Sequence, residues 1–549
     1  MHKIDLFKDY ENAKLDTAEG FRHKHRDSTY RVEDIAKHNI EGIPVCVTRN
    51  EEGKLEATFI PDSHLLAIGA TRSGKTTGFV IPTLNLLMKK KNKPNFVISD
   101  PKQELFSNYS GMFEAQGYNV YVIDFTNYAQ SDCWNPLTKY FRLYRKQFSA
   151  IDTDEFIFNT EDFRQEFNGR VYTDYDELAA DIAEYRTACA DEAEKGITAI
   201  CHSVFPERPG VKDPFWDDSA RDLFHAILLG MLEDSGPGGS ITEDNFSFDT
   251  VLKIFDSFSN EDRGPYDKGY FTNRPHFSKA YQLASKCILE QASNTRLCIS
   301  STFAAIMSKF RDIAIRRVTC TNTIEMNKLD DDEKPSVIFL SYKDEESLHY
   351  SIISLFLSNL YTELIATART KSSRLDRPFY FLLDEFGNLP KFNDFDKVIS
   401  ACGGRNIWFL LILQSYAQLN NVYGAETAEI IKDNMNVHMF FGTNNPQTKR
   451  AFSDECGRKT IISPVSALNG KGETIQSYAV DTVALVPVSA LDNLKAGECI
   501  VTQMRENVLW SRIERSYVCP EYDFDGQKQI TRKKLVDFAD PRYSYISKR

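Results

Sequence analysis

A glycine-rich stretch near the amino terminus has the residue types and spacing of a phosphate-binding loop. It matches the pattern G-x-x-x-x-G-K-[ST] at every fixed position. Its residues are Gly69, Ala70, Thr71, Arg72, Ser73, Gly74, Lys75 and Thr76, followed by Thr77. Glycines allow a tight turn whose N–H groups point at nucleotide phosphates, and the lysine adds a full positive charge. The threonine that ends the pattern would place its hydroxyl on Mg²⁺. The pattern predicts nucleotide binding; the alternative is a plain glycine-rich turn.

Two adjacent carboxylates follow an apolar run more than 300 residues downstream. The run Phe379–Leu383 reads as a buried strand, and it ends in Asp384 and Glu385. This is what a Walker B element needs, because the strand carries Asp384 to the sheet edge, where it can hold Mg²⁺ directly or through water. Glu385 can polarise a water for attack on the γ-phosphate. Any buried strand can end in Asp-Glu, so the pair indicates a nucleotide site chiefly because the loop is also present.

A third polar element accompanies the next apolar run, Ile407–Leu413. Gln414 follows this run, so it can sense the γ-phosphate beside the Walker B strand or simply cap its own strand. Arg405 precedes the run and is expected at the opposite edge of the same sheet. From there it is poorly placed for its own nucleotide but can reach a neighbour's, as an arginine finger given in trans within a ring does. A surface or structural arginine is an equal alternative.

Strand and helix patterns alternate on either side of a helical middle. A strand at Leu65–Ile68 precedes the loop, and a helix over Thr77–Met88 follows it, bent or restarted at Pro82. This alternation predicts an α/β fold with a doubly wound, mostly parallel sheet. The block at about 138–330 reads as a separate all-helical domain inserted into that sheet. Further strands are expected at Ile43–Thr48, Phe96–Ser99, Val120–Ile123, Ser336–Leu340, His438–Gly442, Glu498–Met504 and Val508–Tyr517, and a helix at Tyr350–Arg369.

Composition narrows the class of protein. The hydrophobic share of 42% and the charged share of 26% are those of a globular chain rather than a disordered one. The net charge of −12 argues against a protein that coats nucleic acid through a basic surface. Residues 151–200 hold much of the acidity. The eleven cysteines are scattered singly without a C-x-x-C pair, so neither a zinc site nor a disulfide framework is indicated. No apolar run in the sequence approaches the length of ~20 residues that a membrane-spanning helix needs.

Several motifs resemble the coupling ATPases of conjugation and type IV secretion, the VirD/TraG group. The resemblance runs from about residue 60 to 520, with the motifs in family order. After the loop comes a D-P-K-G-E-like element in which Gln103 replaces glycine. The element at 381–390, FLLDEFGNLP, is close to the family's Walker B signature and is the most specific match. The other elements are Asp100-Pro101-Lys102-Gln103-Glu104, Trp134-Asn135-Pro136-Leu137, and Gln414-Ser415 with Gln418-Leu419 and Tyr423-Gly424. Arg405 falls where the family places the arginine of the neighbouring-subunit contact.

The resemblance implies a RecA-like P-loop motor domain that carries an all-α domain. The expected division is an N-terminal segment at 1–60, motor sequence at 61–137 and 331–520, the all-α insert at 138–330, and a tail at 521–549. The resemblance also implies a hexamer when active, compatible with a monomer in isolation. ATP and Mg²⁺ would be held by the loop, Thr76 and Asp384, with Glu385, Lys75, Arg405 and Gln414 acting in hydrolysis.

The expected partners are single-stranded DNA with a bound relaxase, channel components of a type IV secretion system, and a membrane-protein anchor. Many family members begin with transmembrane helices, whereas here the motor sheet begins near residue 60 with no apolar span before it. Either the protein is a soluble branch that borrows a membrane partner, or the sequence lacks its native anchor; in the first case the chain is expected in the cytoplasm, recruited to the inner face of the membrane. The acidic tract at 151–200 is a docking surface for a basic partner or a solvated insertion.

Two other functions fit parts of the pattern. One is a FtsK- or HerA-like translocase for double-stranded DNA, which shares the ring motor but not the secretion role. The W-N-P-L turn and the helical insertion weigh against it. The other is a substrate-docking receptor whose nucleotide site only regulates assembly. The presence of Lys75, Asp384 and Glu385 together argues against an inactive site.

Overall fold

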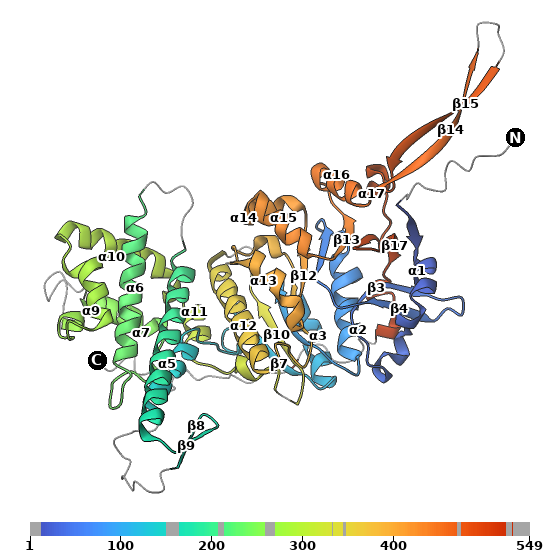
Figure 1. Ribbon diagram of the computed structural model, residues 1–549. Coiled ribbons are helices and arrows are strands. Elements are labelled where there is room, and N and C mark those ends of the chain that lie inside the picture. The colour runs from blue at the N-terminus through green and yellow to red at the C-terminus, as the bar shows by residue number, and fades with distance from the viewer. Residues whose placement is uncertain are drawn as a thin grey trace. The chain divides into compact units, whose positions relative to one another are not determined.

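The computed structural model describes residues 13–149, 164–206, 213–258, 269–331, 333–343, 347–392, 394–468, 474–522 and 530 (Figure 1). Most of the predicted tail at 521–549 lies outside the described residues, as does the start of the acidic tract at 151–200. The chain divides into two compact units. The first, here called the sheet unit, comprises Met1–Val122, Met326–Glu346 and Leu360–Thr531. The second, the helical unit, comprises Ile123–Glu325, Ser347–Asn359 and Arg532–Arg549.

The sheet unit is built around ten strands in the order β1-β17-β16-β13-β5-β12-β11-β6-β10-β7. The pairings from β13 through β5, β12, β11 and β6 to β10 are parallel, and β16 pairs antiparallel with both β13 and β17. These strands are β1 (Leu15–Thr17), β5 (Leu65–Gly69), β6 (Asn95–Asp100), β7 (Asn119–Asp124), β10 (Ser336–Ser341), β11 (Phe379–Leu383), β12 (Ile407–Leu413), β13 (Val437–Gly442), β16 (Glu498–Gln503) and β17 (Val508–Arg512). The predicted doubly wound, mostly parallel sheet is confirmed.

Helices cover both faces of this sheet, which explains why its central strands read as unbroken apolar runs. Side chains alternate between faces along each strand. On one face, Leu65 and Leu382 pack with the helices α2 and α3. On the other, Phe409 contacts Phe381 at 4.6 Å and Phe395 of α13 at 5.2 Å between ring centres. The helices of this unit are α1 (Ala18–Lys24), α2 (Ile81–Lys89), α3 (Glu104–Ala115), α13 (Phe395–Cys402), α14 (Tyr416–Tyr423), α15 (Ala425–Asn434), α16 (Pro446–Glu455) and α17 (Val488–Asp492), together with the part of α12 (Tyr350–Thr370) that begins at Leu360.

The helix after the loop begins with an irregular turn. Thr76–Val80 forms a π-helical turn, and α2 proper begins at Ile81 with Pro82 in its first turn. A proline lacks the N–H that an interior helical position must donate, whereas the first turn of a helix leaves that donor unused. The sequence predicts a bend or a restart at Pro82; in the structure the helix runs on without a break and changes from a π-helical to an α-helical turn beside Pro82.

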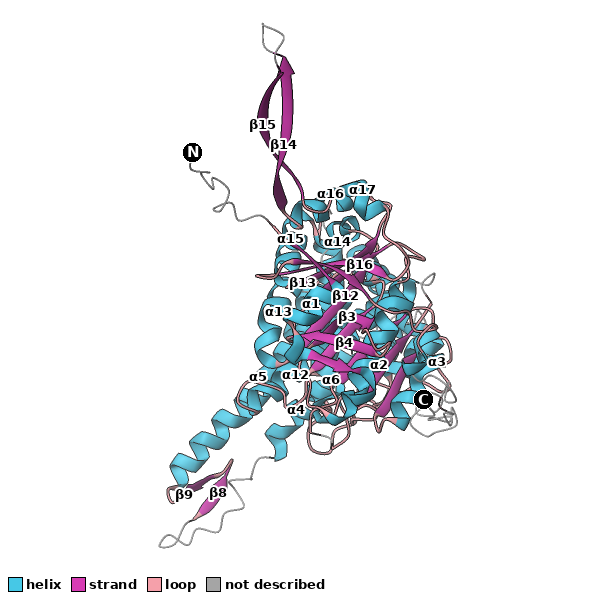
Figure 2. Ribbon diagram, turned by 90° about the vertical axis from the view of Figure 1, so that its right-hand side faces the viewer, coloured by secondary structure: helices cyan, strands magenta, loops and turns pink. Residues whose placement is uncertain are grey.

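Three β structures were not predicted from the sequence, two of them in the sheet unit and the third a short hairpin in the block that was expected to be all-helical. The first sixty residues, expected to hold one short strand, form a three-stranded sheet of β2 (Thr29–Arg31), β4 (Leu55–Ile60) and β3 (Ile43–Arg49), and they also supply β1. A separate hairpin joins β14 (Arg458–Leu468) to β15 (Thr474–Ala484) and extends beyond α16 and α17 in both views (Figure 2). Strands of three residues are too short to show a period, and the hairpin sequence mixes small and polar residues throughout.

The helical unit is mostly α-helical, with one short hairpin of β8 (Gln165–Phe167) and β9 (Arg170–Tyr172). Its helices are α4 (Thr138–Ser149), α5 (Tyr175–Val204), α6 (Phe215–Glu233), α7 (Phe248–Phe258), α8 (Gly269–Thr272), α9 (Lys279–Ala284), α10 (Ser293–Met307) and α11 (Ile313–Thr319). Phenylalanine rings fill its interior: Phe255 and Phe303 stack at 4.3 Å, and Phe224 packs nearby against Phe205. The boundaries predicted for the inserted domain stay a prediction.

The W-N-P-L turn acts as a structural junction of the helical unit. Trp134 N donates to Val318 O at 2.7 Å, and Asn135 Nδ2 donates to Phe246 O at the same distance. Asn135 Oδ1 also accepts from Leu137 N, which fixes the turn. The motif therefore ties segments distant in the chain together, and its contacts serve the fold.

One described helix, α12, has the length and composition of a membrane span, although half of its most apolar stretch is buried inside the protein. A core helix of a globular fold passes the same test. All eleven cysteines are free, and most are buried, as the sequence indicates.

A buried histidine should make stability depend on pH. His64 lies just before β5, is only 5% exposed, and its Nδ1 accepts a hydrogen bond from Phe409 N at 3.0 Å. Burial lowers the pKa of His64 from 6.5 to about 4. Because the neutral ring is favoured only in the folded state, its stabilisation is present above pH 6.5 and is lost as pH falls towards 4. The loss should reach about 3 kcal/mol near pH 4.

Urea unfolding of the wild type and of His64→Asn at pH 7 and pH 4.5 checks this expectation. The asparagine can accept the same backbone bond but does not titrate, so its free energy of unfolding should fall less between the two pH values. The exposed His202→Asn serves as the control and should behave as the wild type. An equal fall in wild type and His64→Asn would contradict the assignment.

Candidate nucleotide-binding and hydrolysis site

The two distant motifs meet at one edge of the parallel sheet. β12 stands between β5, which leads into the loop, and β11, which leads into the carboxylates. Because the three strands are parallel, their carboxyl ends lie at the same edge. Lys75 Nζ lies 3.6 Å from Glu385 Oε1, and both side chains are about nine-tenths buried. The fold therefore brings the ammonium of one motif and a carboxylate of the other into one site.

The loop folds back on itself, as a phosphate-binding loop does. Gly74 has φ +93 and Arg72 has φ +67, so the backbone turns back on itself within three residues. At Gly69 an added Cβ would lie 2.5 Å from both Ser73 Oγ and Lys75 Cγ, so only glycine fits there. Ala70 N donates to Gly442 O at 2.7 Å, which fixes the loop to β13.

The polar groups of the loop fit a phosphate ligand. Lys75 Nζ and Ser73 Oγ are buried, and neither has a hydrogen-bond partner among the described residues. A buried ammonium that donates no hydrogen bond is costly, and the ion pair with Glu385 at 3.6 Å compensates this cost only in part. Phosphate oxygens are acceptors of the kind these donors lack. A nucleotide phosphate would thus complete the hydrogen bonding of the loop.

The Walker B turn is strained in a way that aims its carboxylates. Glu385 has φ +51, an unusual conformation for a residue with a side chain, and Asp384 Oδ1 accepts from Glu385 N at 2.9 Å. Burial raises the pKa of Asp384, while the charge of Lys75 opposes this shift. A bound Mg²⁺ would favour the ionised carboxylate in the same direction as Lys75 does.

Gln414 lies directly on the general-base candidate. Its Nε2 donates to Glu385 Oε2 at 2.9 Å, and its backbone N donates to Gln418 Oε1 at 2.8 Å. Gln418 also packs so closely on Gly387 that a Cβ there would lie 2.7 Å from the Cβ of Gln418. The third motif therefore holds both Glu385 and the turn that follows it.

Arg405 does not join this cluster. It ends the turn that precedes β12, whereas Gln414 follows the other end of that strand, so about 20 Å of extended chain separates them. Arg405 Nη1 donates to Ala401 O at 2.6 Å, and its buried Nε has no partner in the described part of the chain. The arginine is thus held against its own helix α13 at the amino-terminal edge of the sheet.

The D-P-K-Q-E element contributes a further carboxylate, Asp100, to which the sequence pattern assigns no role. Asp100 is the last residue of β6, the neighbour of β11, and its Oδ2 accepts from Phe106 N of α3 at 2.8 Å. Burial raises the pKa of Asp100 to about 7, and the charge of Asp384 adds to that rise. The adjacent Ser99 Oγ donates to Asp384 O at 3.1 Å. Asp100 therefore belongs to the surroundings of the Walker B carboxylate.

Gln103 replaces the glycine of the family pattern at a position where a glycine would fit without strain. It stands in the left-handed region, φ +57, immediately before α3. A glycine adopts that conformation without strain, so Gln103→Gly should raise the free energy of unfolding by up to about 1 kcal/mol. Denaturant unfolding measures the change. Gln116→Gly is the control at the other end of α3: Gln116 has φ −82 and its Oε1 accepts from Lys93 Nζ at 3.3 Å, so this change should not raise the free energy of unfolding.

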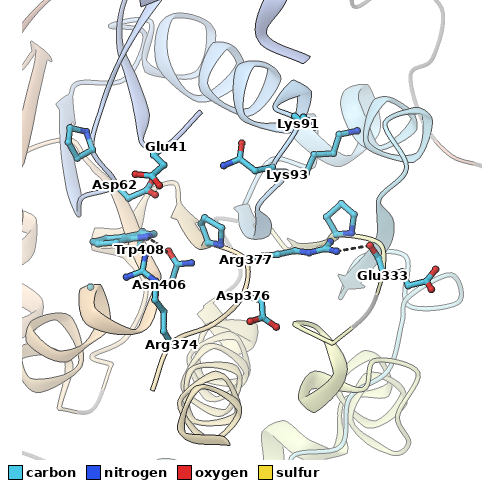
Figure 3. A pocket seen from close by; sticks show the side chains of 15 residues that line it. Glu41, Asp62, Lys91, Lys93, Glu333, Arg374, Asp376, Arg377, Asn406 and Trp408 are labelled. Atoms are coloured by element: carbon cyan, nitrogen blue, oxygen red, sulfur yellow. Dashed lines mark hydrogen bonds between the residues drawn. The ribbon is translucent and has the colours of Figure 1, made fainter. Parts of the chain in front are cut away.

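A hollow of about 660 Å³ lies at the opposite edge of the sheet from the cluster (Figure 3). Trp408 and Asn406 of the β12 end line it together with Arg374, Arg377 and four carboxylates. Arg377 Nη2 is turned to Glu333 O at 2.6 Å. Cations and anions balance here, and none of the predicted catalytic groups reaches it.

Comparisons with known proteins agree on one family. The model for the type IV secretory system conjugative DNA transfer family matches residues 9–478. The chain is 24% identical over 273 residues to the coupling protein TraD of Escherichia coli (strain K12), which covers 50% of this chain and 34% of TraD. It is 22% identical to VirD4 of Rhizobium radiobacter over 405 residues, 72% of this chain and 48% of VirD4. The chain thus spans half or less of the length of these two relatives.

Solved structures of the conjugative coupling protein TrwB share the fold. Unbound TrwBΔN70 superposes with a TM-score of 0.55 at 13% identity, covering 82% of this chain and 84% of that one. TrwB in complex with ADP and Mg²⁺ gives 0.52 at 14% identity, with the same coverage. This likeness confirms the predicted RecA-like P-loop fold. Taken with the family match over most of its length, it places the chain in the type IV secretory system conjugative DNA transfer family.

Proposed function

We propose that this protein is an ATP-hydrolysing coupling protein that recruits relaxase–DNA or protein substrates and drives them into a type IV secretion channel. The observation that carries the proposal is the cluster in which Glu385 lies 3.6 Å from Lys75 and 2.9 Å from Gln414. A general base, a phosphate-binding cation and a γ-phosphate sensor are thereby within reach of one bound triphosphate.

Each residue of the cluster has a defined task. Lys75 and the N–H groups of residues 69–77 bind the β- and γ-phosphates, and Thr76 with Asp384 holds Mg²⁺. When bound, Mg²⁺ neutralises charge that develops on the phosphates. Glu385 accepts a proton from the attacking water, and Gln414 orients that carboxylate and reports whether a γ-phosphate is present. Binding of nucleotide analogues by TrwB supports ATP as the ligand.

The family supports the rest of the proposal. The matching family model is that of type IV secretory system conjugative DNA transfer, so the partners would be single-stranded DNA with a relaxase, channel components and a membrane-protein anchor. We place the chain at the inner face of the membrane, as a homo-hexamer when active. Arg405 would then complete the site of the adjacent subunit from the amino-terminal edge of its own sheet.

Turnover of ATP with and without DNA tests the proposal. We expect Mg²⁺-dependent hydrolysis that single-stranded DNA stimulates, and its loss in Glu385→Gln with ATP binding retained. Nucleotide binding without turnover under any condition would favour a docking receptor. Stimulation by double-stranded DNA alone, with no binding of relaxase, would favour a duplex translocase.

A further inference from the structure

The segment that follows the last strand of the sheet runs beside the phosphate-binding loop. After β17 ends at Arg512, Glu514 N donates to Val47 O at 3.1 Å and Ser516 N donates to Thr77 O at 2.9 Å. Thr77 is the residue that directly follows the loop pattern. The segment is therefore attached to the first turn of the helix that the loop leads into.

The guanidinium of Arg515 contacts the loop itself. A Cβ built on Gly74 would lie 2.7 Å from Arg515 Nη2 and 3.2 Å from its Cζ. Arg515 Nη1 donates to the Tyr517 hydroxyl at 3.0 Å, whereas its buried Nε has no hydrogen-bond partner among the described residues. Within that part of the chain no carboxylate forms an ion pair with it. A cation without an anion thus stands against the second glycine of a loop that binds phosphates.

This position is fixed from both sides. Downstream of Arg515, the carbonyl of Tyr522 accepts from Asn85 Nδ2 at 2.6 Å and from Lys89 Nζ at 3.1 Å, both on α2. The Tyr522 ring is fully buried. Because the segment is anchored before and after Arg515, the guanidinium is preorganised at the loop rather than free to sample solvent.

We infer that Arg515 binds the phosphates of the nucleotide in its own subunit and that the ring of Tyr517 covers the base. The inference rests on the proposed function, since it adds two contact residues to the same nucleotide site. Arg515 lies at Gly74 rather than at the Glu385 end of Lys75, so it addresses the α- and β-phosphates, which ATP and ADP share. Tyr517 is 68% exposed with its ring centre 5.9 Å from Arg515 Cζ, and an exposed aromatic face can stack a purine.

The inference predicts a distinct pattern of affinities in equilibrium titrations with Mg²⁺. Loss of a charged hydrogen-bond donor typically weakens binding about 10- to 100-fold. Arg515→Ala should therefore weaken ATP, ADP and inorganic tripolyphosphate by a similar factor, and in turnover it should raise KM more than it lowers kcat. Tyr517→Ala should weaken ATP and ADP but leave tripolyphosphate binding unchanged.

Two variants separate a ligand contact from a structural role. Arg512→Ala is the matched control, because Arg512 is exposed and paired with Glu514 at 3.4 Å, and it should bind nucleotides as the wild type does. Arg515→Lys keeps the charge and should retain part of the affinity, with an unchanged melting temperature in the absence of nucleotide. If Arg515→Ala melts early, the comparison is made with Arg515→Gln instead.

The outcomes distinguish this inference from the proposed function. Wild-type ADP affinity in folded Arg515→Ala or Arg515→Gln, alongside lost ATP turnover in Glu385→Gln, would overturn the inference and leave the ATPase in place. Failure of the wild-type protein to bind any nucleotide would overturn both. Weakened ATP binding with unchanged ADP binding would assign Arg515 to the γ-phosphate and overturn its placement at the shared phosphates.

Discussion

Replacing Lys75 by alanine should reduce ATP turnover by at least about 100-fold and abolish substrate transfer, while the protein stays folded. The Lys75 ammonium lies 3.6 Å from the carboxylate of Glu385. Charges aimed at a phosphoryl transition state each contribute a factor of this order or more. Steady-state phosphate release, with and without single-stranded DNA, measures the effect.

The fold should tolerate this change because Lys75 Nζ has no hydrogen-bond partner among the described residues. Removing the ammonium leaves Glu385 buried without its nearby cation, which lowers the stability, but Glu385 keeps its bond from Gln414. Lys91→Ala is the control, since Lys91 is exposed at the opposite edge of the sheet. Turnover by Lys75→Ala at the wild-type rate would remove the motor function altogether.

Replacing Arg405 by alanine should abolish hydrolysis and leave ATP binding intact. The side chain lies a whole strand away from Gln414, so it cannot assist its own nucleotide. If it completes the neighbouring site, arginine fingers of this kind contribute about 10³- to 10⁵-fold to turnover. The measurement pairs nucleotide titration with turnover on the same preparation.

Mixing supplies the second readout. Equal amounts of wild-type and Arg405→Ala protein should hydrolyse ATP at well below half the wild-type rate, because each altered subunit disables a neighbour. Arg369→Ala, an exposed arginine of α12, should have no such effect. Strictly proportional activity in the mixture would assign Arg405 a role confined to its own subunit, where it bonds to Ala401 O.

The sequence predicts the central fold well because its strands are buried on both faces. Runs such as Ile407–Leu413 contain no polar residue to blur their ends, so the predicted and observed bounds coincide. Parallel pairing then requires that the loop and the Walker B carboxylates meet at one edge. The order of the strands is not encoded locally, so the hydrogen bond between Gln414 and Glu385 could not be predicted from the sequence and is seen only in the structure.

The elements and contacts that could not be predicted have no periodic pattern in the sequence. β1 and β2 have three residues each, and Arg515 belongs to no motif because its relevance comes from chain segments that are far apart in sequence. The proximity of Asp100 to Asp384 likewise follows from the adjacency of β6 and β11, which no spacing along the chain reveals. Sequence patterns thus identify the motifs, and tertiary pairing decides their neighbours.

The position of β12 has a mechanical consequence. This seven-residue strand connects Gln414 at its carboxyl end with the turn that ends in Arg405 at its amino end, so a displacement of Gln414 can be passed towards Arg405 through one strand. In a closed ring, this strand would link hydrolysis at one nucleotide site to the position of the arginine at the adjacent site. Blocking hydrolysis at one site should then affect the neighbour that this subunit's Arg405 contacts before it affects the neighbour on the other side.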